Sequence, residues 1–226
     1  MPSGFRDRPG DHFPQSLRPM RYRALAAYIM PLSKTRFLIS GLPAAFLLAG
    51  LFFFLLLSLE NRKSYETAID FFKQNQALIK NKNYVAVIDY TKPSFVKRLF
   101  IYDVKSGTAA RYLVAHGKGS GFIFAKDFSN EINSNKSSNG FFITGEIFIG
   151  EHGPSLPLHG LQEGLNNNAF KRDIIIHGAD YVSWSSIIVN MGRLGRSLGC
   201  PAVAQDKINE VIDKLKGGAL VYIYAF

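Results

Sequence analysis

The sequence has few of the residues that form disulfides or bind metals in small domains. It has one cysteine and one tryptophan in 226 residues, so no disulfide can form within the chain and a disulfide-rich scaffold is excluded. The histidines and carboxylates show no spacing typical of a metal site, so we expect neither a metal nor another cofactor. Acidic residues are also scarce, 17 against 27 Lys and Arg, which gives a formal net charge of +10.

Hydrophobic residues are abundant instead. They form 47% of the chain and include 19 Phe, which excludes a disordered or collagen-like protein. The length fits one domain with an appendage. Half of the excess positive charge lies in residues 1–36, and no basic residues alternate with aromatic ones, so we expect no nucleic-acid partner.

A 23-residue run from Phe37 to Leu59 carries no charge. As a helix it would be about 34 Å long, enough to cross a hydrocarbon core of about 30 Å. Residues 1–36 hold seven Arg or Lys against two Asp, so this basic tail is expected to stay cytoplasmic. The sequence therefore predicts a single-pass inner-membrane protein whose remaining residues are extracytoplasmic, in the periplasm.

A cleaved signal peptide is the alternative to this anchor. Its apolar core would be shorter, about 7–15 residues, and would be followed by a small-x-small cleavage site. Ser58-Leu59-Glu60 provides no such site, so we favour an uncleaved anchor. The start codon stays open, because Met20 or Met30 would give the same anchor without the polar residues before it.

The exported part divides into a juxtamembrane helix or stalk (60–83) and a domain rich in predicted strands (84–226). Ser64 is the expected N-cap of a helix reaching Lys82, by its apolar spacing. The short β-branched and aromatic runs that follow predict a mainly β fold, mostly antiparallel, either a sandwich or a partly closed barrel with short helices. The predicted strands cover 83–90, 98–104, 109–116, 140–150, 155–160, 171–178 and 218–226, and the helices 184–191 and 205–216.

Cys200 is the candidate nucleophile, because an unpaired cysteine in an oxidising compartment is a liability unless its reactivity is used. It lies between Gly199 and Pro201 at a predicted loop-to-helix junction. A helix N-terminus there would lower the thiol pKa, and its amides could hold an oxyanion. His177 ends an apolar strand 23 residues earlier and is the candidate base. A buried, unreactive cysteine is the alternative reading.

The order of these motifs resembles the L,D-transpeptidase (YkuD-type) domain, and specifically the murein L,D-transpeptidase catalytic domain family. Matching stretches cover nearly all of residues 84–226. They are VIDYTKPSFVKRLFIYDVKSG (87–107), VAHGKGSG (114–121), FSN (128–130), SSNGFFITGE (137–146), GEHGPSLPLHGLQEGLNNNA (150–169), IIIHGADYVS (174–183) and GRLGRSLGCPAV (192–203).

The resemblance implies a peptidoglycan-modifying enzyme. Cys200 would attack the carbonyl before the terminal D-alanine of a tetrapeptide stem, and the acyl-enzyme would pass to an amine or to water. His177 would act as general base and acid, with its ring oriented by the backbone carbonyl of Gly178. The amides of Gly199 and Cys200 would stabilise the oxyanion. The acceptor stays open between a 3–3 cross-link, a D-amino acid, a protein amine and water.

This chain departs from the wider family at Leu198, where a second histidine is usual, and at Pro201-Ala202, where an Asn is frequent. His116 or Tyr181 could supply the missing polar group. We further expect substrate contacts from Arg196, Ser197, His116 and Arg193, the arginines by clamping a stem-peptide carboxylate. A degenerate, non-catalytic peptidoglycan-binding module is the alternative function. A sortase-like enzyme is disfavoured because no arginine follows Cys200.

Overall fold

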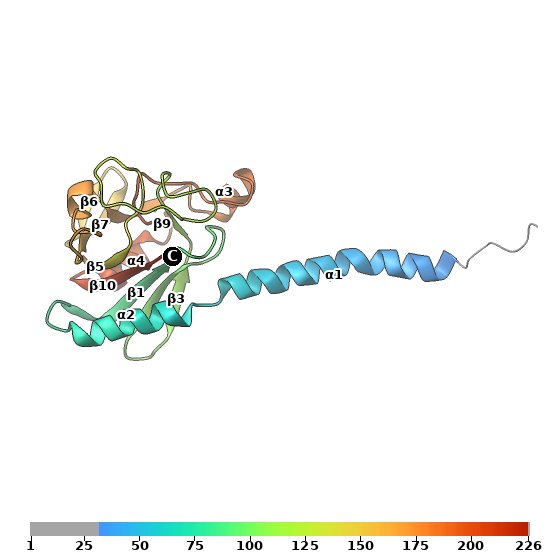
Figure 1. Ribbon diagram of the computed structural model, residues 1–226, viewed down its shortest axis with the longest axis horizontal. Coiled ribbons are helices and arrows are strands. Elements are labelled where there is room, and N and C mark those ends of the chain that lie inside the picture. Colours follow the sequence, from blue (N-terminus) through green and yellow to red (C-terminus); the bar gives the residue numbers. More distant parts are fainter. Residues whose placement is uncertain (1–31, 226) are drawn as a thin grey trace, which may run out of the picture. The chain divides into compact units, whose positions relative to one another are not determined.

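The computed structural model describes residues 32–225, so most of the predicted basic tail and both alternative start codons lie outside the described residues. Figure 1 shows a curved sheet with short helices, preceded by one long helix. The helices are α1 (Leu32–Ser58), α2 (Arg62–Gln74), α3 (Trp184–Val189) and α4 (Ile208–Leu215), with one 3-10 turn (Phe170–Arg172). The strands are β1 (Asn81–Asp89), β2 (Leu99–Asp103), β3 (Ala109–Tyr112), β4 (Val114–Ala115), β5 (Gly140–Thr144), β6 (Phe148–Gly150), β7 (Gly153–Gly160), β8 (Ile175–Ala179), β9 (Ala202–Ala204) and β10 (Ala219–Tyr224).

Helix α1 contains the apolar run noted in the sequence. The described chain has one helical run that is long and apolar enough to cross a membrane, and it includes the C-terminal half of α1. Side chains there, such as Phe46, Leu47 and Phe52, are 64–75% exposed. A helix whose described apolar side chains are mostly exposed fits a lipid environment, as a signal sequence or an anchor.

The sheet is nearly closed. Its strands follow the order β3-β2-β1-β10-β5-β7-β8-β9-β4, with β6 paired to β7. The two edge strands, β3 and β4, are consecutive in the chain and only Leu113 separates them. A single residue can connect the edges only if the sheet curls back on itself. A partly closed barrel is thereby confirmed over the two-sheet sandwich.

Strand direction is more mixed than expected. Most pairs are antiparallel, but β1 pairs with β10, and β8 with β9, in parallel. The main core fills the inside of the curled sheet with side chains from nearly every strand and from α4, including Ile88, Phe142, Ile176 and Val211. The parallel pairing of β8 with β9 positions two candidate site residues, because His177 lies in β8 and Cys200 lies two residues before β9.

The segment after α1 is a packing helix of the domain. In α2, Ala68 and Phe72 are buried against Val85, Phe100 and neighbouring residues of the sheet, and the helix lies beside β1 in Figure 1. The expected N-cap was wrong. Asn61 caps the helix, since its side chain accepts a hydrogen bond from the Lys63 amide at 3.1 Å, and the helix ends at Gln74.

Two segments near the site differ from the sequence prediction. Residues 170–172 form a 3-10 turn that Asp173 ends with a left-handed φ of 53°, so β8 starts only at Ile175. Ala202–Ala204 forms β9, where a helix was expected directly after Cys200, and α4 begins later, at Ile208. Residues 202–204 form a strand because they pair with β8 on one side and with β4 on the other.

Candidate active site

Neighbouring strands bring His177 and Cys200 to the same region. His177 pairs with Ala202 in the parallel β8/β9 ladder, and Cys200 precedes Ala202 by two residues. Side chains two positions apart on extended chain point to the same side. The Cys200 thiol accordingly lies at the Ile175 end of β8, where it donates a hydrogen bond to the Asp173 carbonyl at 3.3 Å.

The His177 ring is held by a hydrogen bond and by a stacking contact. It is 2% exposed, and its Nδ1 lies 2.8 Å from the carbonyl oxygen of Gly178. With Nδ1 protonated by that contact, Nε2 is left as the free base of the ring. His152, at the turn between β6 and β7, stacks on His177 with ring centroids 4.3 Å apart. Burial lowers the pKa of His177 below its ordinary value, and the His152 ring lowers it further.

The Cys200 thiol has a raised pKa, contrary to the prediction. Burial is the main cause, and the charge of Asp173 acts in the same direction. The expected lowering relied on a helix N-terminus, but β9 follows Cys200 and a strand end has no comparable dipole. The Ile175 amide and the nearby Arg172 oppose the increase without overcoming it.

The loop before Cys200 is fixed by its own hydrogen bonds. The Ser197 hydroxyl donates to the Cys200 carbonyl at 2.6 Å and accepts from the Gly199 amide at 3.1 Å. Ser197 is 6% exposed, so it shapes the loop from within and does not face a substrate. The Gly199 amide, predicted to hold an oxyanion, is engaged with Ser197 in this conformation. Leu198 between them is 66% exposed.

Gly199 is required at its position by conformation and by space. Its φ is +136°, a value that side chains of L-residues rarely adopt. A Cβ there would lie 2.9 Å from the backbone oxygen of Lys136 and 3.1 Å from Ile174 Cδ1. The backbone next to Cys200 is therefore packed closely against the polar loop 129–138.

Arg172 holds that polar loop against Gly199 through several hydrogen bonds. This role was not predicted from the sequence. The Arg172 guanidinium donates to the Ser129 carbonyl and the Ser138 hydroxyl, and at 3.0 Å to Ser134 Oγ and 2.6 Å to the Lys136 carbonyl. Burial lowers the pKa of Arg172, while the proximity of Cys200 raises it. A positive charge is thus held near the sulfur.

His116, one of the predicted substrate contacts, lies in the interior. It is 1% exposed, Arg98 donates to its Nδ1 at 2.7 Å, and its Nε2 lies 3.3 Å from the Gly121 carbonyl. Burial, and then Arg98, lower the pKa of His116 to about 3. A neutral ring with both nitrogens engaged cannot contact a substrate, so this prediction was wrong.

Arg193 and Arg196 gather around the same buried cluster. Arg196 donates to the carbonyls of Lys118 and Gly121 at 3.2 and 3.0 Å. The Arg193 guanidinium lies 4.5 Å from the centre of the Phe122 ring. Their charges help to lower the pKa of His116. Both arginines therefore hold the 117–122 loop, where the sequence predicted a clamp on a substrate carboxylate.

Two hollows flank the β6–β7 hairpin that carries His152. One, of about 520 Å³, is polar and is lined by Glu151, His152, Gly153, Gly178, Ala179, Asp180, Tyr181 and Gln205. The other, of about 490 Å³, is mostly apolar and is lined by Glu146, Ile147, Phe148, Pro157, His159, Phe170, Asp173, Ile174 and Ile175. Both volumes lie within the range of about 300–1,000 Å³ found for ligand sites.

Tyr181, in the polar hollow, interacts electrostatically with Cys200. Burial raises its pKa to about 12, and the sulfur contributes to the increase. The phenol therefore stays protonated and able to donate a hydrogen bond at neutral pH. His152 and Arg172 were missed as site residues because nothing local marks them. The only available signal was the position of His152 in a His-Gly turn within a matching stretch.

Residues 58–224 match the family model described as the L,D-transpeptidase catalytic domain. The match covers well over half of the 226 residues, and the chain belongs to this family. No curated protein matches the chain.

Several solved structures are similar. An L,D-transpeptidase from Xylanimonas cellulosilytica is 17% identical with a TM-score of 0.38, over 63% of this chain and 60% of that one. The helical cell shape determining protein Pgp2 from Campylobacter jejuni is 14% identical with a TM-score of 0.40, over 66% and 51%. An L,D-transpeptidase from Mycobacterium smegmatis is 11% identical with a TM-score of 0.38, over 63% and 59%. The chain thus matches between 51% and 60% of the length of these proteins.

Proposed function

We propose that this protein is a cysteine L,D-transpeptidase or L,D-carboxypeptidase that acts on peptidoglycan stem peptides. The observation that carries the proposal is the placement of His177 on β8 and of Cys200 two residues before the adjoining parallel strand β9, with His177 Nδ1 bound to the Gly178 carbonyl. That contact leaves Nε2 free to take a proton from the thiol. Membership of the family supports the same chemistry.

In the proposed reaction, the Cys200 thiol first leaves the Asp173 carbonyl and gives its proton to His177 Nε2. The thiolate attacks the carbonyl carbon that precedes the terminal D-alanine. The C–N bond then breaks, His177 returns the proton to the departing amine, and a thioester remains on Cys200. An amine or water attacks the thioester, loses its proton to His177 and regenerates the thiol.

The oxyanion needs donors other than a second histidine. The Cys200 amide points toward its own sulfur, and we assign it as one donor. We assign the Tyr181 hydroxyl as the second, because Tyr181 lines the polar hollow next to His177 and interacts electrostatically with Cys200. The Gly199 amide would join them only after it leaves Ser197.

The two hollows give the acyl donor and the acceptor separate approaches. Glu151 and Asp180 place two carboxylates in the polar hollow, where they would attract a protonated amine and so favour transfer over hydrolysis. The apolar hollow ends at Asp173 and Ile175, both in contact with the Cys200 sulfur. It therefore suits the acyl donor.

We further propose that α1 is an uncleaved anchor that holds the catalytic domain on the extracytoplasmic side of the inner membrane. The length of the helix and its exposed apolar side chains support this arrangement. The arginine-rich residues before the apolar run support a cytoplasmic N-terminus. Glu60–Phe226 then meets its substrate in the periplasm.

A catalytically inactive peptidoglycan-binding module is the second candidate function. Leu198 presents an apolar side chain where the wider family is expected to have a histidine. The raised pKa of Cys200, and the engagement of its thiol by Asp173, also describe a resting nucleophile of low reactivity. This module would bind stem peptides without releasing D-alanine.

The deciding experiment uses the full chain in detergent micelles, fully reduced. Intact mass is measured after incubation with a carbapenem and, separately, with a disaccharide-tetrapeptide. An adduct on Cys200 together with D-alanine release supports the enzyme. Cys200→Ala should abolish both, and His177→Ala should nearly abolish turnover. Stem-peptide binding that survives Cys200→Ala, with no adduct and no D-alanine from the folded wild type, would establish the module instead.

A further inference from the structure

A third hollow lies beyond the opposite end of β9 from Cys200. It has a volume of about 430 Å³ and is lined by Lys97, Ala110, Arg111, Tyr112, Leu113, Val182, Ser183, Trp184, Ala204, Asp206, Lys207 and Glu210. We call it the Trp184 pocket. Neither Cys200 nor His177 lines it, so the catalytic machinery does not account for it. The volume is within the range found for small-molecule sites.

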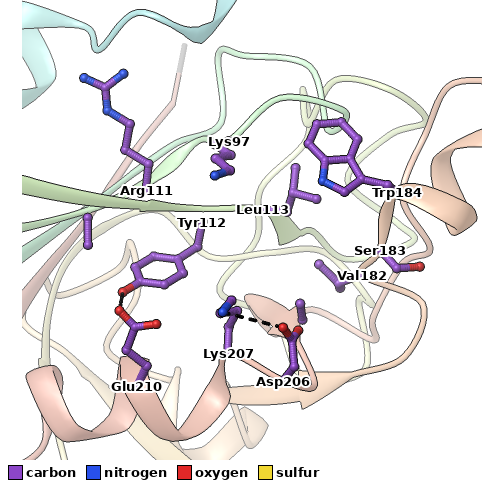
Figure 2. Close-up of a pocket in the computed structure, with 12 residues that line it drawn as sticks. Lys97, Arg111, Tyr112, Leu113, Val182, Ser183, Trp184, Asp206, Lys207 and Glu210 are labelled. Carbon is purple, nitrogen blue, oxygen red and sulfur yellow. Dashed lines mark hydrogen bonds and ion pairs between the residues drawn. The ribbon is translucent and has the colours of Figure 1, made fainter.

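The pocket has an apolar base and an aromatic wall. Leu113 and Val182 are 8% and 1% exposed and form its base, whereas Trp184 is 52% exposed. Figure 2 shows the indole on one side of the pocket and Tyr112 with Glu210 on the other. Trp184 is the single tryptophan of the chain. A large indole left half in water offers a flat apolar surface with no partner inside the described domain.

The polar groups around the pocket carry both signs of charge. Asp206 and Lys207 pair at 3.6 Å, and the Tyr112 hydroxyl donates to Glu210 at 2.7 Å. Lys97 and Arg111 add positive charge. A ligand with a net charge would meet repulsion as well as attraction here. A neutral ligand rich in hydroxyl and amide groups finds both donors and acceptors.

We propose that the Trp184 pocket binds a neutral amino-sugar ring of the glycan strand. The apolar face of the sugar stacks on the indole, and its hydroxyl and N-acetyl groups bond to Asp206, Lys207 and Ser183. The proposal rests on the function proposed above, since it assigns the pocket to the sugar that carries the stem peptide.

The spacing along β9 agrees with such a substrate. Cys200 lies in a bend two residues before β9 and Ala204 ends that strand, so the two are at most roughly 13 Å apart at about 3.3 Å per residue. The attacked carbonyl belongs to the third residue of the stem, and three extended residues span about 10–11 Å. A sugar in the Trp184 pocket could therefore present its own stem to Cys200.

The test uses the intrinsic fluorescence of the full chain in detergent, which reports Trp184 alone. Tetra-N-acetylated chitotetraose (chitotetraose below), a neutral glycan with no peptide, is titrated into the Cys200→Ala variant, where turnover cannot interfere. We expect a saturable blue shift of the emission as the sugar covers the indole. No change with chitotetraose would overturn the proposal. A shift produced by the free tetrapeptide, and not by the sugar, would reassign the pocket to the peptide.

Calorimetry then separates the pocket from the rest of the surface. Trp184→Ala should weaken chitotetraose binding by on the order of tenfold, through loss of the stacking surface. Ile188→Ala is the matched control, because Ile188 is 80% exposed on the same helix and does not line the pocket. Equal affinities for both variants would refute the assignment.

Activity distinguishes this proposal from the catalytic one. Trp184→Ala should raise the KM for a disaccharide-tetrapeptide and leave the KM for the free tetrapeptide unchanged. An equal rise for both substrates would refute a glycan site. If the wild type releases no D-alanine but still binds chitotetraose, the catalytic proposal fails and the glycan site stands.

Discussion

Gly199→Ala tests whether the loop conformation next to Cys200 is imposed by the structure. At φ +136° an alanine is outside the left-handed region that L-residues tolerate, which costs on the order of 1–3 kcal/mol. The new Cβ would also meet the Lys136 backbone oxygen at 2.9 Å, and this atom is held by Arg172. We expect a total loss of about 2–4 kcal/mol in unfolding free energy.

Gly107→Ala is the matched control. Gly107 has φ +70° and no atom within 4 Å of its ideal Cβ, so only the left-handed conformation is penalised, by about 1 kcal/mol. Urea unfolding of the full chain in detergent, followed by tryptophan fluorescence, compares the two variants. Carbapenem acylation should slow markedly in Gly199→Ala alone, because Cys200 is displaced. Equal stabilities, or wild-type acylation in Gly199→Ala, would refute the reasoning.

The remaining predictions concern ionisable and hydroxyl groups. The pKa of His116 falls to about 3 on folding, so on acidification the unfolded chain takes up a proton at higher pH than the folded chain. The free energy of unfolding should therefore decline from about pH 6.5 toward pH 3, by up to about 4–5 kcal/mol. His116→Gln should flatten this slope in pH-dependent urea unfolding. His152→Phe keeps a ring on His177 but removes the charge, so the acidic limb of the kcat/KM profile should move to higher pH with kcat nearly retained, whereas His152→Ala should also lower kcat. Tyr181→Phe should lower kcat by about 10²-fold with unchanged thermal stability, if its hydroxyl stabilises the oxyanion. Wild-type profiles or rates in these variants would contradict the corresponding roles.

Most of the fold could be predicted from the sequence, because local residue patterns mark its strands. Val85 to Ile88 and Leu220 to Ile223 are β-branched and apolar runs bounded by turn residues, and they form the paired centre of the sheet. The chain order of strands does not reveal which of them pair. Strands β3 and β4 form the two edges because the sheet curls back on itself through contacts between residues far apart in the chain. No local sequence pattern predicts these contacts.

Errors at the site have a common physical origin. Ala202 and Val203 are equally compatible with a helix start and a short strand. The strand is selected by pairing partners 25 residues away on β8 and 87 or 89 residues away on β4. His116 and the two arginines looked accessible because they lie among glycines. His116 is in fact buried against Arg98, 18 residues away, and the arginines bond to the carbonyls and pack on the ring of the 117–122 loop, more than 70 residues away.

The same long-range contacts explain how a cysteine with a raised pKa could still be a usable nucleophile. Burial and the charge of Asp173 favour the thiol form of Cys200. In the proposed mechanism, proton transfer to His177 therefore accompanies attack, and His177 must be neutral to accept the proton. The structure meets that condition twice, because burial and His152 both lower the pKa of His177. Arg172 then provides a nearby positive charge that favours the thiolate once it forms. A site of this kind should react slowly with small thiol reagents yet readily with a bound acyl donor. If iodoacetamide alkylated Cys200 faster than a free thiol at pH 7, the thiolate would already be present and this coupling would be wrong.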